Sequence, residues 1–238
     1  MRCVPDRVHG FSERPHYEPA ELDTMFEKIA GDFLRSHRGK MSIPLGTDDI
    51  KTLIERDADD LDQYADLSKF GASIEGMTEF IRGQKPRVYI AAELSESDTR
   101  QNRLRTTLTH EYGHVALHAY LFEFERSGRL NLGPNQKPNA IYCKRETIVG
   151  ARASDWMEWQ AGYACGALLM PKSFVQRLAG GFQREKNIYG PVLAGSEDGQ
   201  ALIGKVAAEF CVSRDAAHVR LSVLNFLGNP PATRSLFQ

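Results

Sequence analysis

The chain has 238 residues, enough for one domain or for one domain with a small helical addition. Its 30 Lys and Arg residues nearly balance its 31 Asp and Glu residues, which argues against capture of nucleic acid or anionic lipid mainly by charge. No apolar run of about 18 residues could span a bilayer, and the start lacks the apolar stretch of a signal peptide, so we expect a cytoplasmic protein with no membrane partner.

Proline content and apolar periodicity predict the elements of the first third of the chain. The first 19 residues contain three prolines and are predicted to form an arm. Apolar residues at three- and four-residue steps predict an amphipathic helix over 21–35, and a second helix is predicted over 47–56. The stretch 57–66 is rich in aspartate and is interpreted as a solvated face, with a docking surface for a basic partner as the alternative.

The middle of the chain combines strand and helix signals. Two short strands are predicted over 72–81 and 87–92, with a Gly-Pro turn between them, and together they indicate a small sheet. A long helix is predicted over 99–124, followed by a polar loop over 127–139. The sequence therefore predicts an α+β fold that is mainly helical.

The last third is predicted to be helical as well. Ser154 or Asp155 can cap a helix that Pro171 closes. After Gly180-Gly181, a linker-like stretch is expected as far as Gly199. Two final helices are predicted over 200–210 and 214–227.

This order of elements divides the chain into three expected segments. An N-terminal arm and helix occupy 1–42, and a core occupies 43–181. A helical C-terminal annex occupies 182–238.

The stretch LTHEYGHVALH carries residues that suit metal chemistry. His110, Glu111 and His114 stand in H-E-x-x-H register in the predicted helix, and residues four apart lie on one helical face. Two imidazoles can therefore reach one cation while Glu111 points toward a metal-bound water and accepts its proton. Gly113 would let a neighbouring element approach closely. The alternative is that these are polar residues on a helix surface.

A catalytic zinc site needs a third protein ligand. The metzincin spacing would require glycine and histidine where the chain has Leu117 and Tyr120, so that class is excluded. The Cα of His118 would lie about 12 Å along the helix axis from that of His110, so a supporting or packing role is favoured over ligation. Glu158, in the first turn of a later helix, is the better candidate, with a surface carboxylate as the alternative.

Two stretches together resemble the ImmA/IrrE family of zinc metallopeptidases. RLRTTLTHEYGHVALH (103–118) is similar to the family's R-F-T-L-A-H-E-x-G-H-x-x-L-H helix. EWQAGYACGALLMP (158–171) is similar to its later E-x-x-A-N-x-F-A-x-x-L-L-M-P helix. Gly162 departs from the family's usual Asn or Asp, so a hydrogen bond to a ligand histidine would have to come from elsewhere.

The resemblance implies a zincin-like core and a zinc endopeptidase of the gluzincin type. His110, His114 and Glu158 would hold Zn²⁺, and Glu111 would be the catalytic carboxylate. The expected substrate is a specific protein partner, such as a helix-turn-helix repressor or antitoxin-like regulator encoded nearby. The expected roles are transcription regulation, stress response or a toxin–antitoxin pair.

The donor that would stabilise the oxyanion of the reaction stays open. Four side chains offer a suitable group, namely Tyr142, Tyr163, His218 and Arg220.

The segment 206–224 supports an alternative function. Its spacing is that of a helix-turn-helix, with Ser213 as the cap of the second helix. The DNA contacts would be Arg214, His218 and Arg220. Three basic residues stand against four acidic ones from 197 to 228, a poor match to phosphate, so packing against the core is favoured over DNA contact. A DNA-binding or sensor regulator with a structural zinc helix, or a toxin-like component, stays as an alternative.

Overall fold

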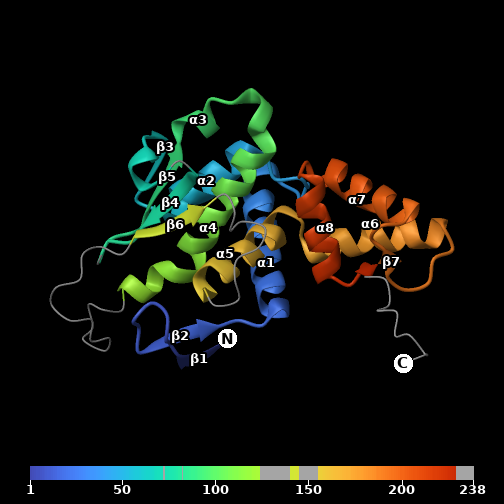
Figure 1. The fold of residues 1–238 in the computed structure, drawn as a ribbon, viewed down its shortest axis with the longest axis horizontal. Helices are drawn as coiled ribbons and strands as arrows, with labels where there is room; N and C mark the ends of the chain where they lie inside the picture. The colour runs from blue at the N-terminus through green and yellow to red at the C-terminus, as the bar shows by residue number, and fades with distance from the viewer. Residues whose placement is uncertain (72, 82, 124–139, 145–154, 229–238) are drawn as a thin grey trace, which may run out of the picture. The chain divides into compact units, whose positions relative to one another are not determined.

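A computed structural model describes residues 1–71, 73–81, 83–123, 140–144 and 155–228. The fold is α+β, with helices α1 to α8 and small sheets (Figure 1). The chain forms two compact units, residues 1–171 and 172–238. The predicted polar loop over 127–139 lies outside the described residues.

The units differ from the predicted segments at both boundaries. Residues 1–42 belong with the core, because α1 (Pro19–Arg38) packs against α5 (Trp156–Leu169) within the first unit. The second boundary falls at Lys172, where α6 (Lys172–Glu185) begins, because α6 packs against α7 (Glu197–Phe210).

The helices of the first unit follow the predicted periodicity. In α1, Leu22, Phe26 and Ala30 recur at four-residue steps and are fully buried. This helix ends at Gly39, which takes the left-handed φ of 69° that glycine tolerates at a helix end. The other helices of this unit are α2 (Thr47–Asp57), α3 (Ala92–Ser95), α4 (Gln101–Glu123) and α5, with short 3₁₀ turns at Ser68–Phe70 and Asp98–Arg100.

A mixed four-stranded sheet lies beside α4, in the order β3-β5-β4-β6 (Figure 1). The two predicted strands correspond to β4 (Ile74–Glu79) and β5 (Arg87–Ala91), and β6 (Ala140–Lys144) pairs antiparallel with β4. The aspartate-rich stretch also contributes a strand, β3 (Asp60–Ala65), which runs parallel to β5. β4, one of the two inner strands, is almost wholly buried.

The N-terminal segment is a hairpin rather than the predicted arm. Strand β1 (Arg2–Pro5) pairs antiparallel with β2 (Glu13–His16), and Cys3 lies opposite Pro15. A two-stranded hairpin has only edge strands, and edge strands tolerate proline because one row of backbone groups is not needed for pairing. The prolines that suggested an irregular arm are therefore compatible with strands here.

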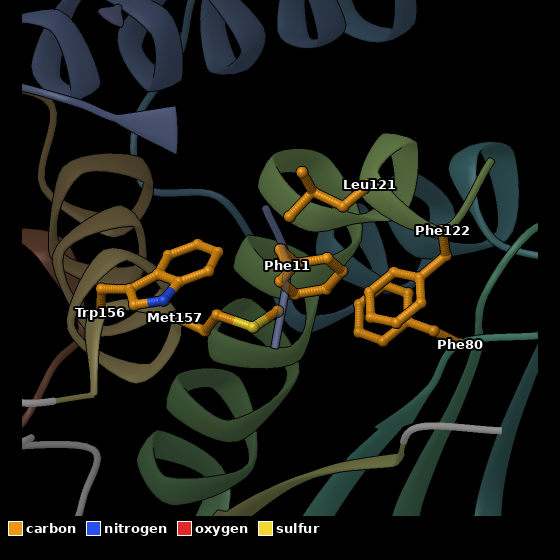
Figure 2. Packing of buried hydrophobic residues seen from close by; sticks show 6 residues of the cluster. All are labelled: Phe11, Phe80, Leu121, Phe122, Trp156 and Met157. Atoms are coloured by element: carbon orange, nitrogen blue, oxygen red, sulfur yellow. The ribbon is translucent and has the colours of Figure 1, made fainter. Parts of the chain in front are cut away.

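An aromatic cluster joins this segment to the end of α4 and the start of α5 (Figure 2). Phe11 meets Phe122 edge-on with a ring separation of 5.5 Å, and Phe80 stacks on Phe122 at 4.2 Å. The cluster consists of Phe11, Phe80, Leu121, Phe122, Trp156 and Met157.

The second unit contains a helix that the sequence did not predict. The expected linker begins at Gly180-Gly181, but both glycines lie inside α6. Two glycines cost an α-helix about 1 kcal/mol each relative to alanine. Burial of Val175, Ala179 and Phe182 along one face outweighs this cost, since most helical stability comes from packing.

The last two predicted helices are both present, and a short turn joins them. Helix α7 is followed by α8 (Arg214–Val223), and the Oγ of Ser213 accepts a hydrogen bond from the Ala216 N–H at 3.1 Å, as the expected cap. Helix α8 ends earlier than predicted because Asn225 takes a left-handed φ of 60°. Beyond it, β8 (Leu227–Gly228) pairs parallel with β7 (Val192–Leu193). Within the described residues, no helix is both long and apolar enough to cross a membrane.

Candidate metal centre

Gly113 allows α4 and α5 to cross closely. A Cβ on Gly113 would lie 3.0 Å from the Cα of Ala161 and 3.2 Å from the Cβ of Ala164. A distance of 3.0 Å to backbone is too short for an ordinary contact, so a larger residue would push the helices apart. The predicted close approach at Gly113 is therefore confirmed, and it brings the first turns of α5 beside the middle of α4.

The start of α5 is held by a side-chain cap. The Asp155 carboxylate accepts hydrogen bonds from the backbone N–H groups of Met157 and Glu158, at 3.1 and 3.3 Å. A cap of this kind satisfies N–H groups that have no partner inside the helix. It also fixes the first turn, from which Glu158 projects toward α4.

Three side chains from these two helices converge. The Nε2 atoms of His110 and His114 lie 3.1 Å apart. Glu158 places Oε2 3.1 Å from the Nε2 of His110 and Oε1 3.4 Å from the Nε2 of His114. Both histidines are fully buried, and Glu158 is 7% exposed. The helix spacing and the α4–α5 crossing thus bring the three predicted ligands together.

The geometry of this group fits a metal ion. A tetrahedral ion with ligand bonds of about 2.0–2.1 Å places its ligand atoms about 3.3 Å from one another. The two Nε2 atoms, 3.1 Å apart, are close to that spacing, and each histidine has a different Glu158 oxygen within 3.4 Å. One ligand atom from each residue lies within 4.8 Å of the others. The buried His-His-Glu group could therefore hold a metal ion.

The contacts between Glu158 and the two histidines shift the pKa values of Glu158 and His114 in opposite directions. Burial opposes ionisation of Glu158, but hydrogen bonds to His110 and His114 outweigh it and lower the pKa of Glu158 well below its ordinary value of 4.5. Burial likewise opposes a charge on His114, but Glu158 outweighs it and raises the pKa of this histidine above 6.5.

Glu111 points to the sheet side of α4. Its Oε2 accepts a hydrogen bond from the Thr78 hydroxyl on β4, at 2.7 Å, while its Oε1 is buried and has no hydrogen-bond partner among the described residues. A Cβ on Gly76 would lie only 2.7 Å from Oε1, so the glycine leaves the space that this oxygen occupies. Burial raises the pKa of Glu111, and the nearby charges of His114 and His110 oppose that rise.

His118 lies beyond His114, away from the converging Nε2 atoms. Its Nδ1 is 3.2 Å from the Nδ1 of His114, and its Nε2 is 3.0 Å from the Oε1 of Gln160. The ring is fully buried and meets the indole of Trp156 edge-on at 5.4 Å. Burial, followed by the charge of His114, lowers the pKa of His118 well below 6.5. His118 contacts a candidate ligand rather than the ligand cluster itself.

Of the four candidate oxyanion donors, Tyr163 is the one whose side chain the structure describes in the same unit as this group, and it points elsewhere. The Tyr163 hydroxyl donates to Asp23 on α1, at 3.1 Å, because Tyr163 is five residues beyond Glu158 and projects from another face of α5. Tyr142 is on β6 opposite Met77, and its side chain lies outside the described residues. His218 and Arg220 are on α8 in the second unit.

Sequence reasoning missed three residues of the site: Gly76, Thr78 and Gln160. Gly76 and Thr78 are on β4, and contact between a strand and Glu111 leaves no local pattern in the sequence. Gln160 is two residues after Glu158 inside the motif stretch. An amide side chain in an otherwise apolar helix could have indicated a buried group that needs hydrogen-bond partners.

Comparison of the sequence with protein-family models and with curated proteins gives no match. The resemblance to ImmA/IrrE peptidases therefore rests on the two motif stretches, and the metal centre rests on its own geometry.

Proposed function

We propose that the chain is a zinc-dependent endopeptidase with a zincin-like core in its first unit. The observation that carries this proposal is the buried convergence of His110, His114 and Glu158, with Glu111 next to the first ligand. Two histidines and one glutamate are a ligand set of catalytic zinc sites, in which a fourth position stays open. A structural zinc site usually has four protein ligands, commonly including cysteine, so the donor set favours catalysis.

When bound, a zinc ion supplies Lewis acidity, which lowers the pKa of water to about 7 and polarises a peptide carbonyl. The chain's own proton transfer is assigned to Glu111. Thr78 holds Oε2, so the unpartnered Oε1 takes the proton from the attacking water. The water oxygen bonds to the carbonyl carbon, the C–N bond breaks, and Oε1 delivers the proton to the leaving amine.

The proposed substrate is a helix-turn-helix repressor or an antitoxin-like regulator encoded nearby, and the proposed location is the cytoplasm. This part of the proposal comes from the resemblance of the two motif stretches. The associated roles are transcription regulation, stress response or a toxin–antitoxin pair.

The DNA-binding alternative has weaker support. Of its three expected contacts, Arg220 is buried, and Arg214 donates to the backbone and side-chain oxygens of Gln200, at 3.0 and 2.7 Å. A buried or engaged arginine is poorly placed to contact phosphate or bases. His218 is exposed, but a single histidine offers little electrostatic affinity for nucleic acid.

The test is cleavage of a helix-turn-helix protein encoded beside this chain. Purified wild type loaded with zinc should cut it at one or a few sites, and a chelator should stop the reaction. The matched control is Glu111→Gln, which preserves side-chain size and should retain zinc. Equal turnover by wild type and Glu111→Gln would contradict the hydrolytic mechanism.

A further inference from the structure

A buried chain of hydrogen bonds connects His114 to the N-terminal hairpin. It runs from the Nδ1 of His114 to the Nδ1 of His118, at 3.2 Å, and from the Nε2 of His118 to the Oε1 of Gln160, at 3.0 Å. The Nε2 of Gln160 then donates to the backbone carbonyl of Pro15, at 2.9 Å. The three side chains are at most 1% exposed, so water cannot replace these contacts.

The carbonyl of Pro15, at the far end of this series of hydrogen bonds, sets the donor and the acceptor of each hydrogen bond before it. A backbone carbonyl can only accept, so Gln160 must turn its NH₂ group toward Pro15 and its Oε1 toward His118. The Oε1 atom in turn can only accept, so neutral His118 carries its proton on Nε2. The Nδ1 of His118 is then a bare acceptor, and it receives the Nδ1–H of His114.

A neutral imidazole with its proton on Nδ1 has a free lone pair on Nε2. For His114 this is the atom that converges with His110 and Glu158. We propose that His118 and Gln160 are positioning residues that fix the tautomer and ring orientation of His114 for metal binding. This inference rests on the metal centre of the proposed function and assigns it an additional supporting pair.

The hairpin that provides the final acceptor is itself fastened to the start of α5. Asp6 accepts from the indole Nε1 of Trp156 at 3.0 Å, and the Nε2 of His9 lies 3.0 Å from the Oδ1 of Asp155. Phe11 adds an apolar contact in the aromatic cluster (Figure 2). The carbonyl of Pro15 is therefore a fixed acceptor rather than part of a loose arm.

His110 has no comparable support. Its Nδ1 is buried and has no hydrogen-bond partner among the described residues. Metal-binding histidines usually donate their second N–H to an acceptor, and loss of such a partner typically weakens metal affinity by about 10- to 100-fold. His114 is therefore the ligand on which the effect of a supporting partner can be measured.

The experiment measures the dissociation constants for zinc and cobalt(II), and the visible spectrum of the cobalt form, in the full-length chain. His118→Leu removes the acceptor and keeps an apolar side chain, whereas His118→Asn places an amide oxygen near the former Nδ1. Gln160→Met removes the link to Pro15 at similar length. Gln183→Met is the matched control, because Gln183 also donates to a backbone carbonyl, that of Gly190 at 2.8 Å, but belongs to the second unit.

We expect His118→Leu to bind metal about 10- to 100-fold more weakly and to change the cobalt spectrum, with most of the affinity regained in His118→Asn. Gln160→Met should weaken binding in the same direction, and Gln183→Met should leave both readouts unchanged. If His118→Leu does not fold, Gln160→Met carries the test. If His118→Leu or Gln160→Met had the metal affinity and cobalt spectrum of wild type, the inference about His118 and Gln160 would be overturned, and the metal centre would be unaffected. A wild-type chain that binds neither metal would overturn the metal centre as well.

Discussion

The two compact units bury different kinds of side chain. Within the described residues, the first unit buries a set of polar and charged groups around α4 and α5, whereas the only buried charged side chain of the second unit is Arg220. In the first unit these groups are Asp23, Glu75, Thr78, Arg105, Thr107, Thr109, His110, Glu111, His114, His118, Glu158 and Gln160.

This difference sets a polar interior apart from an apolar one. Burial of a polar group costs free energy unless the group is hydrogen-bonded, so a fold that needs only stability buries apolar residues. The second unit does so with Val175, Phe182, Leu202 and Leu221. The polar interior of the first unit includes the three residues that could hold a metal ion, His110, His114 and Glu158.

The largest expected effect concerns Glu111, which belongs to the polar interior and is not a proposed ligand. Glu111→Gln should lower the rate of peptide cleavage by about 100- to 10,000-fold, the usual contribution of a general base. Zinc content should stay unchanged, because the three ligands are intact. Cleavage kinetics and metal analysis of the same preparation check both statements, and a variant that lost its zinc would place Glu111 among the ligands.

Gly113 offers a test of close packing with a control in the other unit. Gly113→Ala should destabilise the chain by about 1–3 kcal/mol, because the new methyl group would press on the backbone of Ala161. Gly181→Ala, inside α6, meets nothing within 4 Å and should stabilise the chain by up to about 1 kcal/mol. Denaturant unfolding measures both changes. A Gly113→Ala variant as stable as wild type would contradict the tight α4–α5 crossing.

The caps of α5 and α8 separate stability from metal binding. Asp155→Ala and Ser213→Ala each remove a side-chain acceptor at a helix start and should cost about 0.5–2 kcal/mol of unfolding free energy. Only Asp155→Ala should also weaken zinc binding, because Glu158 is in the turn that Asp155 holds. Calorimetric titration with zinc distinguishes the two, and equal zinc affinity in both variants would mean that the cap does not position the ligand.

The smallest effect is expected at Arg214, on the exposed side of α8. Arg214→Ala should change the unfolding free energy by less than about 1 kcal/mol, since an exposed hydrogen-bonding contact contributes little. It should leave zinc affinity and any cleavage unchanged. A gel-shift assay with DNA from the adjacent promoter checks the alternative function, because a shift by wild type that is lost in this variant would favour DNA binding.

Local patterns in the sequence were sufficient for part of the site. The spacing of His110 and His114 on one helical face, the cap at Asp155 and the stop at Pro171 all depend on neighbours within a few residues. Each of these features is present in α4 and α5. Glu158 could be identified as a candidate because a catalytic zinc site needs a third ligand and because Glu158 is a carboxylate in the first turn of a helix.

Other parts depend on contacts between distant residues and could not be predicted. The bond between Gln160 and Pro15 joins positions 145 residues apart, and that between Thr78 and Glu111 joins positions 33 apart. Neither leaves a periodic signal. The N-terminal hairpin was missed for the same reason, since its pairing and its contacts with α5 outweigh a local composition typical of an arm.

Zinc content is the most direct test of the account. Wild-type protein and Glu158→Ala would be loaded with zinc, dialysed against metal-free buffer and analysed for metal and protein concentration. We predict one bound zinc per wild-type chain and a substantial loss in Glu158→Ala, because Glu158 approaches both histidines. A wild-type chain without zinc, or a full equivalent retained by Glu158→Ala, would contradict the proposed metal centre.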